Sequence, residues 1–244
     1  MAFRRLLSDQ LSYVNAYNGT IKKKGGSIMN KNMTELVFIL DRSGSMSGLE
    51  DDTIGGFNGM LERQKSSNQQ VNVTTVLFDD KVEVIHDRFP VDYIQPLTRE
   101  DYYVRGCTAL LDAIGIAIHK IENVQVHMPE DHRAGKVIFV ITTDGHENSS
   151  KMYTYSMIHD QIEKKRSEGW EFLFLGANID AIREAGRLGI SEKRAANYAN
   201  DQKGVSLNYE VVGKALCRAV NVTQSETLFE DDWADEIEEY HSQK

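Results

Sequence analysis

Three short segments of the sequence carry oxygen-bearing side chains of the kind that bind hard divalent cations. The first segment holds Asp41, Ser43 and Ser45, and the other two supply Thr108 and Asp144. Two carboxylates and three hydroxyls favour Mg²⁺, or alternatively Mn²⁺ or Ca²⁺, over zinc and copper, which prefer sulfur and imidazole ligands. The sequence therefore predicts a metal site with few charged ligands, whose cation stays electrophilic enough to take a carboxylate from outside.

These segments lie where predicted strands end and a predicted helix begins. The apolar run 36–40 directly precedes Asp41, and a second run, 137–141, ends shortly before Asp144. Continuous apolar runs are typical of strands that are buried on both faces. Because ligands bind at the carboxyl ends of strands in open α/β sheets, we expect the three segments to meet at that edge.

Strands and amphipathic helices alternate along the rest of the sequence. The predicted strands cover residues 36–40, 71–78, 82–89, 137–141 and 171–175. The predicted helices cover residues 49–65, 108–124, 155–168, 181–188 and 207–222. This alternation predicts an α/β fold with a mostly parallel sheet and helices on both faces. The strands 71–78 and 82–89 flank an Asp-Asp turn and form a predicted hairpin.

The three segments resemble the metal-ion-dependent adhesion site (MIDAS) of von Willebrand factor type A (vWA) domains. Residues 38–46 (FILDRSGSM) resemble the first metal loop of that family, residues 106–110 with Asp112 resemble the second, and residues 141–145 resemble the third. The resemblance covers residues 33–222. It implies a Rossmann-like, doubly wound fold whose central sheet is mostly parallel, with one antiparallel edge strand from the hairpin.

The resemblance also implies a role for each residue of the predicted site. Ser43, Ser45 and Thr108 would bind the metal through their hydroxyls, and Asp41 and Asp144 would act directly or through water. An Asp or Glu of a partner protein would complete the coordination sphere. We therefore expect a non-enzymatic protein-binding module, similar to the stand-alone intracellular vWA proteins of bacteria and phages that act as assembly or adaptor components.

Two other functions fit part of the pattern. The strand that ends at Asp41 also resembles the first motif of haloacid-dehalogenase-type phosphatases, in which Asp41 would be the nucleophile and Mg²⁺ would steer the phosphate. That mechanism needs a second carboxylate at position 43, which is a serine here. A metal-free scaffold is the other alternative, because Asp and Ser after a strand are common turn and helix-cap residues. The complete set of five residues favours metal binding.

Each of the side chains around the predicted site has two alternative roles or a predicted place at its rim. Tyr102, Tyr103 and Arg105 either contact the partner or are exposed loop residues. Contact with the partner is one interpretation because tyrosine and arginine are common at protein interfaces. His146 and Glu147 are predicted to line the rim of the site.

Cys107 stands where many vWA domains have a glycine. Its thiol is either activated by the neighbouring helix start or is a small buried side chain. Cys107 and Cys217 lack the spacing of a zinc site. We expect them to be reduced thiols, and a single disulfide between them is the alternative.

The composition limits which kinds of partner and which cellular location we expect. A net charge of −9 argues against nucleic acid, which needs clustered Lys and Arg. No apolar run reaches the roughly 20 residues of a membrane-spanning helix. We therefore expect a cytoplasmic protein with a protein partner and no membrane contact. The sequence does not indicate an oligomeric state.

Two extensions flank the predicted domain. Residues 1–32 are polar, and the Lys-Lys-Gly-Gly before Met29 fits a translated ribosome-binding site, in which case Met29 or Met33 is the true start. Residues 223–244 form an acidic tail that carries apolar side chains at helical spacing. These are Phe229, Trp233, Ile237 and Tyr240. They predict a short helix that docks either on the domain itself or on another protein.

Overall fold

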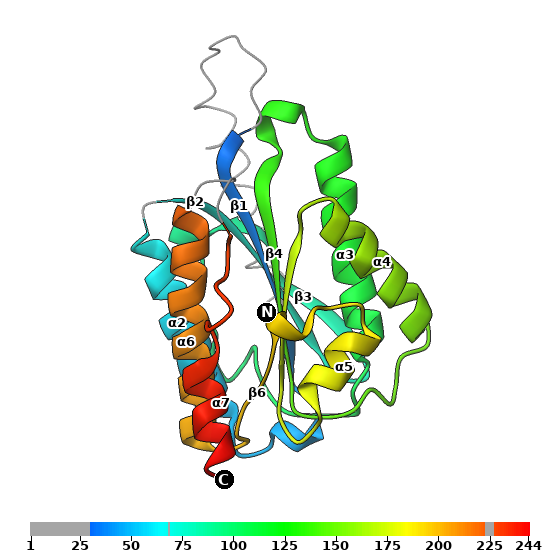
Figure 1. Ribbon diagram of the computed structural model, residues 1–244, viewed down its shortest axis with the longest axis vertical. Coiled ribbons are helices and arrows are strands. Elements are labelled where there is room, and N and C mark those ends of the chain that lie inside the picture. Colours follow the sequence, from blue (N-terminus) through cyan, green and yellow to red (C-terminus); the bar gives the residue numbers. More distant parts are fainter. Residues whose placement is uncertain (1–29, 68, 223–226) are drawn as a thin grey trace.

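The computed structural model describes residues 30–67, 69–222 and 227–244, in which a central sheet lies between two layers of helices (Figure 1). The N-terminal residues 1–29, with the predicted alternative start at Met29, lie outside the described part. Within it, six strands follow the order β3-β2-β1-β4-β5-β6. They are β1 (Asn30–Asp41), β2 (Gln70–Phe78), β3 (Val82–Pro90), β4 (Ala134–Thr143), β5 (Glu171–Gly176) and β6 (Ala195–Asn197). All neighbours are parallel except β2 and β3, so the predicted fold class, with one antiparallel edge strand, is confirmed.

Helices cover both faces of this sheet (Figure 1). One face carries α2 (Glu50–Lys65), α6 (Gln202–Asn221) and α7 (Asp235–Ser242). The other carries α3 (Leu110–His127), α4 (Tyr155–Ser167) and α5 (Ala181–Arg187). Among the described helices, none combines the length and the apolar character needed to cross a bilayer.

The central strand β1 shows why its sequence is apolar without interruption. Leu36 and Phe38 point into the core under α2 and α6, and Val37 and Ile39 point into the core under α3. All four side chains are fully buried. Because successive side chains of a strand point to opposite faces, a strand covered on both faces needs an apolar residue at each position.

The register of the parallel strands brings their carboxyl ends to one edge. Leu40 of β1 lies opposite Thr142 of β4, and Thr143 lies opposite Gly176 of β5. The loops after β1 and β4 therefore leave the sheet side by side. In Figure 1 this edge is the lower end of the molecule, where the short 3-10 helix η1 (Gly44–Met46) follows β1.

The structure differs from the sequence prediction at one missed strand and at the starts of two helices, α6 and α3. The strand β6 was not predicted, because its three residues, Ala-Ala-Asn, carry little strand propensity. Helix α6 begins at Gln202 rather than Leu207, because the side chain of Asp201 caps it by accepting a hydrogen bond from the N–H of Gly204. Helix α3 begins at Leu110, so Thr108 lies in the loop before the helix.

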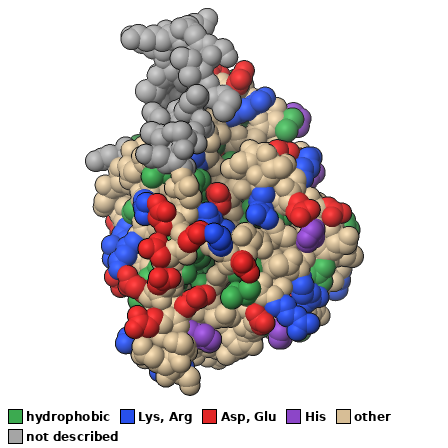
Figure 2. All heavy atoms as spheres, in the orientation of Figure 1, with side chains coloured by type: hydrophobic (Ala, Val, Ile, Leu, Met, Phe, Trp, Pro, Cys, Tyr) green, Lys and Arg blue, Asp and Glu red, His purple; other side chains and the backbone are tan. Residues whose placement is uncertain are grey.

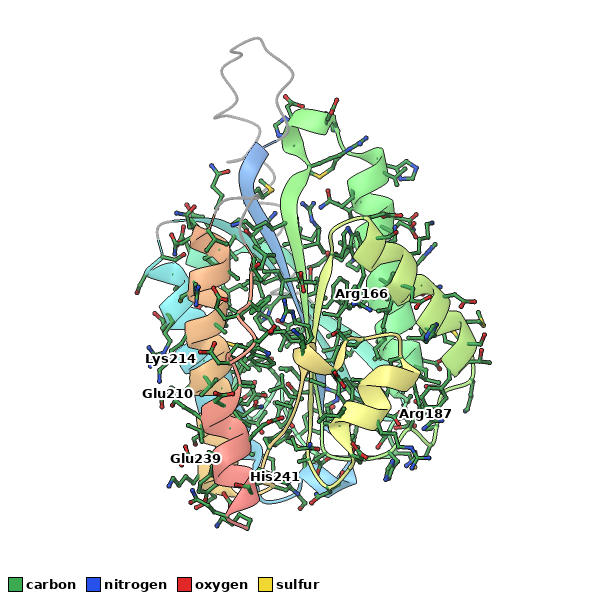
Figure 3. All side chains as sticks on the ribbon, viewed as in Figure 1. Arg166, Arg187, Glu210, Lys214, Glu239 and His241 are labelled. Carbon is green, nitrogen blue, oxygen red and sulfur yellow. The ribbon has the colours of Figure 1, made fainter. Side chains whose placement is uncertain are left out.

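The C-terminal segment packs on the domain itself. Phe229 and Ile237 are buried in the core beside α6. Acidic and basic side chains intermingle over the side of the molecule where α6 and α7 lie (Figure 2). Asp231 pairs with Lys193, and Lys214, which is labelled beside Glu210 on α6 in Figure 3, lies between acidic groups of α6 and α7. Apolar burial therefore holds the segment, and the ion pairs, which are exposed to solvent, add little to it.

Phe229→Ala is expected to lower the stability of the protein by about 2–3 kcal/mol, which corresponds to a fall in Tm of about 4–12 °C. The loss stays below the largest Phe→Ala values because the segment can detach without global unfolding. Thermal unfolding followed by circular dichroism measures the effect. Met152→Ala, which truncates an exposed side chain, is the control and should leave Tm unchanged. An unchanged Tm after deletion of residues 227–244 would contradict self-docking.

Candidate metal site

Asp41 ends β1 and organises the first loop. Its Oδ1 accepts a hydrogen bond from the backbone N–H of Ser43 at 2.7 Å, and its Oδ2 accepts one from the Thr143 hydroxyl at 2.6 Å. The carboxylate is buried at 2% exposure. Asp41 therefore joins the loop after β1 to the end of β4 and fixes the turn that presents the two serines.

The serine hydroxyls continue this connection to the third loop. The Oγ atoms of Ser43 and Ser45 lie 3.1 Å apart, and the Ser45 hydroxyl donates to Asp144 Oδ1 at 2.5 Å. Ser45 reaches solvent, whereas Ser43 and Asp144 are buried. These side chains thus form a cluster of oxygen atoms at the sheet edge, and Ser45 is its solvent-exposed member.

Thr108 joins the site from the second loop. Its backbone exchanges hydrogen bonds with Asn148, one from Thr108 N to Asn148 Oδ1 at 2.9 Å and one from Asn148 N to the Thr108 carbonyl at 3.0 Å. A methyl group placed on Gly145 would lie 3.4 Å from Ser45 Oγ and 3.5 Å from Thr108 Oγ1. The two hydroxyls therefore converge over Gly145, where no side chain intervenes.

The structure thus brings the five predicted residues to one place, and their role as metal ligands stays a prediction. Within the described ranges, no three carboxylate, imidazole or thiol groups converge on one point. The five residues instead combine two carboxylates with three neutral hydroxyls, which is a donor set for a small hard cation.

The two carboxylates are electrostatically poised for a cation. Burial raises the pKa of Asp144 to about 6, and the nearby charge of Asp41 adds to the rise, although the hydrogen bond from Ser45 opposes it. Burial also raises the pKa of Asp41. Asp144 Oδ2 is buried and accepts no hydrogen bond from the described residues. A divalent ion fits this arrangement, because it would satisfy the free oxygen and neutralise both charges.

Asp79, at the turn between β2 and β3, supports the site and was missed by the sequence analysis. Its Oδ2 accepts hydrogen bonds from Arg42 Nε at 2.8 Å and from Arg105 Nε at 2.6 Å. Its backbone carbonyl accepts from the N–H of Ala109 at 2.7 Å. Asp79 therefore ties the loop after β1 to the loop before α3. Burial alone would raise its pKa, but hydrogen bonds from Arg105, Lys81 and Arg42 outweigh it and lower the pKa.

The sequence offered little sign of this role. Asp79 follows a strand and precedes another acid, which is typical of a hairpin turn. Its arginine partners are 37 and 26 residues away along the chain. The one available signal was an arginine directly after Asp41, at a position where burial requires an acidic partner.

Glu147 does not line the rim as predicted. Its carboxylate accepts hydrogen bonds from the backbone N–H groups of Leu111, Ser149 and Ser150, at 2.9, 2.8 and 2.7 Å. It therefore caps the start of α3 and fixes the loop after Asp144. His146 beside it is exposed.

Tyr102 matches neither of its predicted roles. It is fully buried, and its hydroxyl donates to the backbone carbonyl of Asp41 at 2.5 Å. Tyr103 is exposed, and the guanidinium groups of Arg42 and Arg105 lie 5.4 and 5.1 Å from the centre of its ring.

Cys107 is exposed, so the expectation of a small buried side chain is wrong. Both cysteines of the chain, Cys107 and Cys217, are free thiols, and the disulfide that the sequence left open is absent.

Comparisons with known proteins agree with this architecture. No family model and no curated protein matches the sequence. Among solved structures, the fold is similar to proximal thread matrix protein 1 from the mussel byssus with a zinc-occupied MIDAS motif (17% identity, TM-score 0.51, covering 76% of this chain and 46% of that chain). It is also similar to the manganese-loaded TRAP protein of Plasmodium vivax (16% identity, TM-score 0.50, covering 73% and 72%). A third similar structure is the SpRpn10 VWA domain (11% identity, TM-score 0.51, covering 74% and 94%).

The chain spans just under half the length of the mussel protein. Sequence identities this low show a similar fold and do not show a similar activity. The strand order, the single antiparallel edge strand and these matches together show that this chain has the fold of a vWA domain.

Proposed function

We propose that this chain is a protein-binding module that depends on a divalent metal. In this proposal an Asp or Glu side chain of a partner protein completes the coordination sphere. The site residues are Asp41, Ser43, Ser45, Thr108 and Asp144. The observation that carries the proposal is their convergence at one sheet edge, together with the buried Asp144 Oδ2, which accepts no hydrogen bond from the described residues.

The donor set suits binding of an outside ligand. Two carboxylates can balance a divalent charge, and neutral hydroxyls add coordination without reducing the ion's attraction for a further carboxylate. Mg²⁺ is the proposed ion, because it prefers oxygen ligands and octahedral geometry, and Mn²⁺ or Ca²⁺ would be accepted by the same oxygens. The zinc-occupied MIDAS motif of the mussel protein and the manganese-loaded TRAP protein support a divalent site in this fold.

The surroundings of Asp41 favour binding over catalysis. Both of its carboxylate oxygens accept hydrogen bonds and the group is buried, which is a poor arrangement for the nucleophile of a phosphatase. Position 43 holds a serine where that mechanism needs an acid. We therefore propose a non-enzymatic adaptor or assembly component. A cytoplasmic location is part of the same proposal, and the two free thiols support it.

Calorimetric titration of Mg²⁺ tests the site directly. Asp41→Ala is expected to lower the affinity at least about 100-fold, because it removes a carboxylate and releases the Ser43 turn. Gly145→Ala is expected to lower it about tenfold or more, because its methyl group would stand beside two of the hydroxyls. Gly145 has no left-handed backbone, and the contacts of that methyl group are ordinary, so the fold should persist.

Gly55→Ala is the matched control, since Gly55 is exposed on α2 and a methyl group there would touch nothing within 4 Å. It should bind Mg²⁺ as the wild type does. Equal Mg²⁺ affinity in the wild type and in Asp41→Ala would refute the proposed site.

A further inference from the structure

Arg105 is held firmly at the rim of the candidate site. Its Nε donates to the buried Asp79 at 2.6 Å, and its Nη1 donates to the Tyr103 hydroxyl at 3.0 Å. Its guanidinium lies against the Tyr103 ring, and its backbone N–H donates to the carbonyl of Arg42 at 3.0 Å. Few rotamers remain for this side chain, so a ligand that binds it loses little further entropy.

The same side chain keeps binding capacity on its outer side. Arg105 is 35% exposed, whereas its neighbour Arg42 is fully buried and is matched by Asp79 and Glu83. Among the hydrogen bonds of the described residues, none uses Arg105 Nη2 as the donor. A planar guanidinium with free N–H groups is suited to a carboxylate.

Its position ties Arg105 to the metal loops. It lies three residues before Thr108, and its backbone bond to Arg42 places it beside the loop of Ser43. A partner chain that places a carboxylate on the metal from solvent would thus have this guanidinium in the loop that adjoins the Ser43 loop. Lys81, the nearby cation on the β2–β3 turn, is exposed and forms no ion pair among the described residues, so it lacks the same preorganisation.

We propose that Arg105 is a second anchor for the partner, and that the partner segment carries two carboxylates. One carboxylate binds the metal and the other binds the outer edge of the Arg105 guanidinium, with the exposed ring of Tyr103 beside it. The partner of this module is therefore an acidic peptide segment rather than an isolated acidic side chain. This inference rests on the proposed metal site and adds a determinant of specificity to it.

Synthetic peptides with blocked ends test the inference. One peptide carries a single Glu among Gly and Ser, and the others carry two Glu separated by one, two or three residues. Binding to ¹⁵N-labelled protein with saturating Mg²⁺ is followed by NMR. We expect the best-spaced diacid to bind about five- to tenfold more tightly than the monoacid, where a statistical advantage alone would give about twofold. The Arg105 Nε–Hε signal should shift with the diacid and stay in place with the monoacid.

The ratio of the diacid affinity to the monoacid affinity distinguishes a direct contact between Arg105 and the peptide from structural support of the metal loops by Arg105. In Arg105→Gln the ratio should fall to about twofold, the statistical limit, whereas a loss of support for the metal loops would weaken both peptides equally. Arg105→Lys keeps the charge without the planar fork and should give an intermediate ratio. Lys81→Gln is the control and should keep the wild-type ratio.

The outcomes distinguish the two proposals. A wild-type ratio near two, an unchanged ratio in Arg105→Gln, or Mg²⁺ binding without binding of either peptide overturns the role of Arg105 and leaves the metal site standing. Absence of Mg²⁺ binding overturns the metal site, and the anchor falls with it. If Arg105→Gln does not fold, the Nε–Hε signal of Arg105 in the wild type still tests the inference. A signal that does not shift when the diacid is added overturns it.

Discussion

Asp144→Asn is expected to stabilise the metal-free protein at pH 7.5 and to abolish its stabilisation by Mg²⁺. The buried carboxylate of Asp144 has one oxygen without a hydrogen bond and lies near the charge of Asp41. The neutral amide removes this unfavourable charge. Without metal we expect a gain of about 2 kcal/mol, which corresponds to a rise in Tm of about 4–8 °C. With Mg²⁺ at 100 times its Kd, the wild type should gain about 2.7 kcal/mol and the variant nothing.

The dependence of this effect on pH has a defined sign. In the folded, metal-free protein the pKa of Asp144 is about 6, above its ordinary value of 3.8. The folded state therefore holds a proton that the unfolded state has released between these values. Stability from this group is fully present below pH 3.8 and is lost as the pH rises through about 6. The advantage of Asp144→Asn should therefore grow across this window and level off above it.

Thermal unfolding of both proteins at several pH values, with Mg²⁺ and with chelator, measures all of these effects. Asp160→Asn, on the exposed surface of α4, makes the same change of side chain and should shift neither Tm nor the response to Mg²⁺. A variant that is less stable than the wild type with chelator would contradict this account of the two carboxylates. A variant that Mg²⁺ still stabilises fully would contradict Asp144 as a ligand.

Asp144→Asn is expected to stabilise the metal-free protein and to abolish the stabilisation by Mg²⁺ for the same structural reason. The fold holds two carboxylates in a buried place where they repel each other and are poorly solvated, and a cation would reverse that penalty. The metal-free protein is therefore less stable than it would be with neutral side chains at these two positions. In return, the side chains already stand in the arrangement that a cation would need. Proteins commonly accept such local instability at a site that must bind.

The sequence predicted the parts of this molecule that depend on local patterns. The apolar runs of β1 and β4 are buried on both faces, so they could be recognised without knowing their neighbours. The hairpin of β2 and β3 was recognisable by its turn and its strand-forming residues. Because the loops that hold Asp41 and Asp144 directly follow such strands, the meeting of these two residues at one edge also followed from the alternation of elements.

The missed features depend on contacts between distant segments. The strand β6 is held by its pairing with β5 and not by its own residues. The capping role of Glu147 arises because its loop folds back onto the start of α3. The burial of Tyr102 depends on the packing of its loop against the end of β1, and nothing in its local sequence distinguishes it from the exposed Tyr103. Asp79 belongs to the same class.

Asp79→Ala is expected to destabilise the protein by about 3–5 kcal/mol, a larger effect than that of Phe229→Ala or Asp144→Asn. Arg42 and Asp79 are both fully buried and lie 2.8 Å apart. Removing the carboxylate leaves a buried guanidinium whose remaining acidic partner, Glu83, is half-exposed. Urea unfolding, with the midpoint and the slope fitted together, measures the loss. Mg²⁺ binding should also weaken in the protein that remains folded, because the first and second metal loops lose their common partner.

The exposed pair of Asp51 and Arg99 provides the matched control. It has the same chemistry and a distance of 2.5 Å, but both side chains are 70% exposed, so Asp51→Ala should leave the urea midpoint unchanged. The double variant Asp79→Ala with Arg42→Met should recover much of the loss, because it removes the unpaired buried charge. Equal effects of Asp79→Ala and Asp51→Ala would show that the Asp79 contacts do not stabilise the loops. Recovery of stability in the double variant without recovery of Mg²⁺ affinity is the expected signature of a pair whose purpose is to position the metal loops.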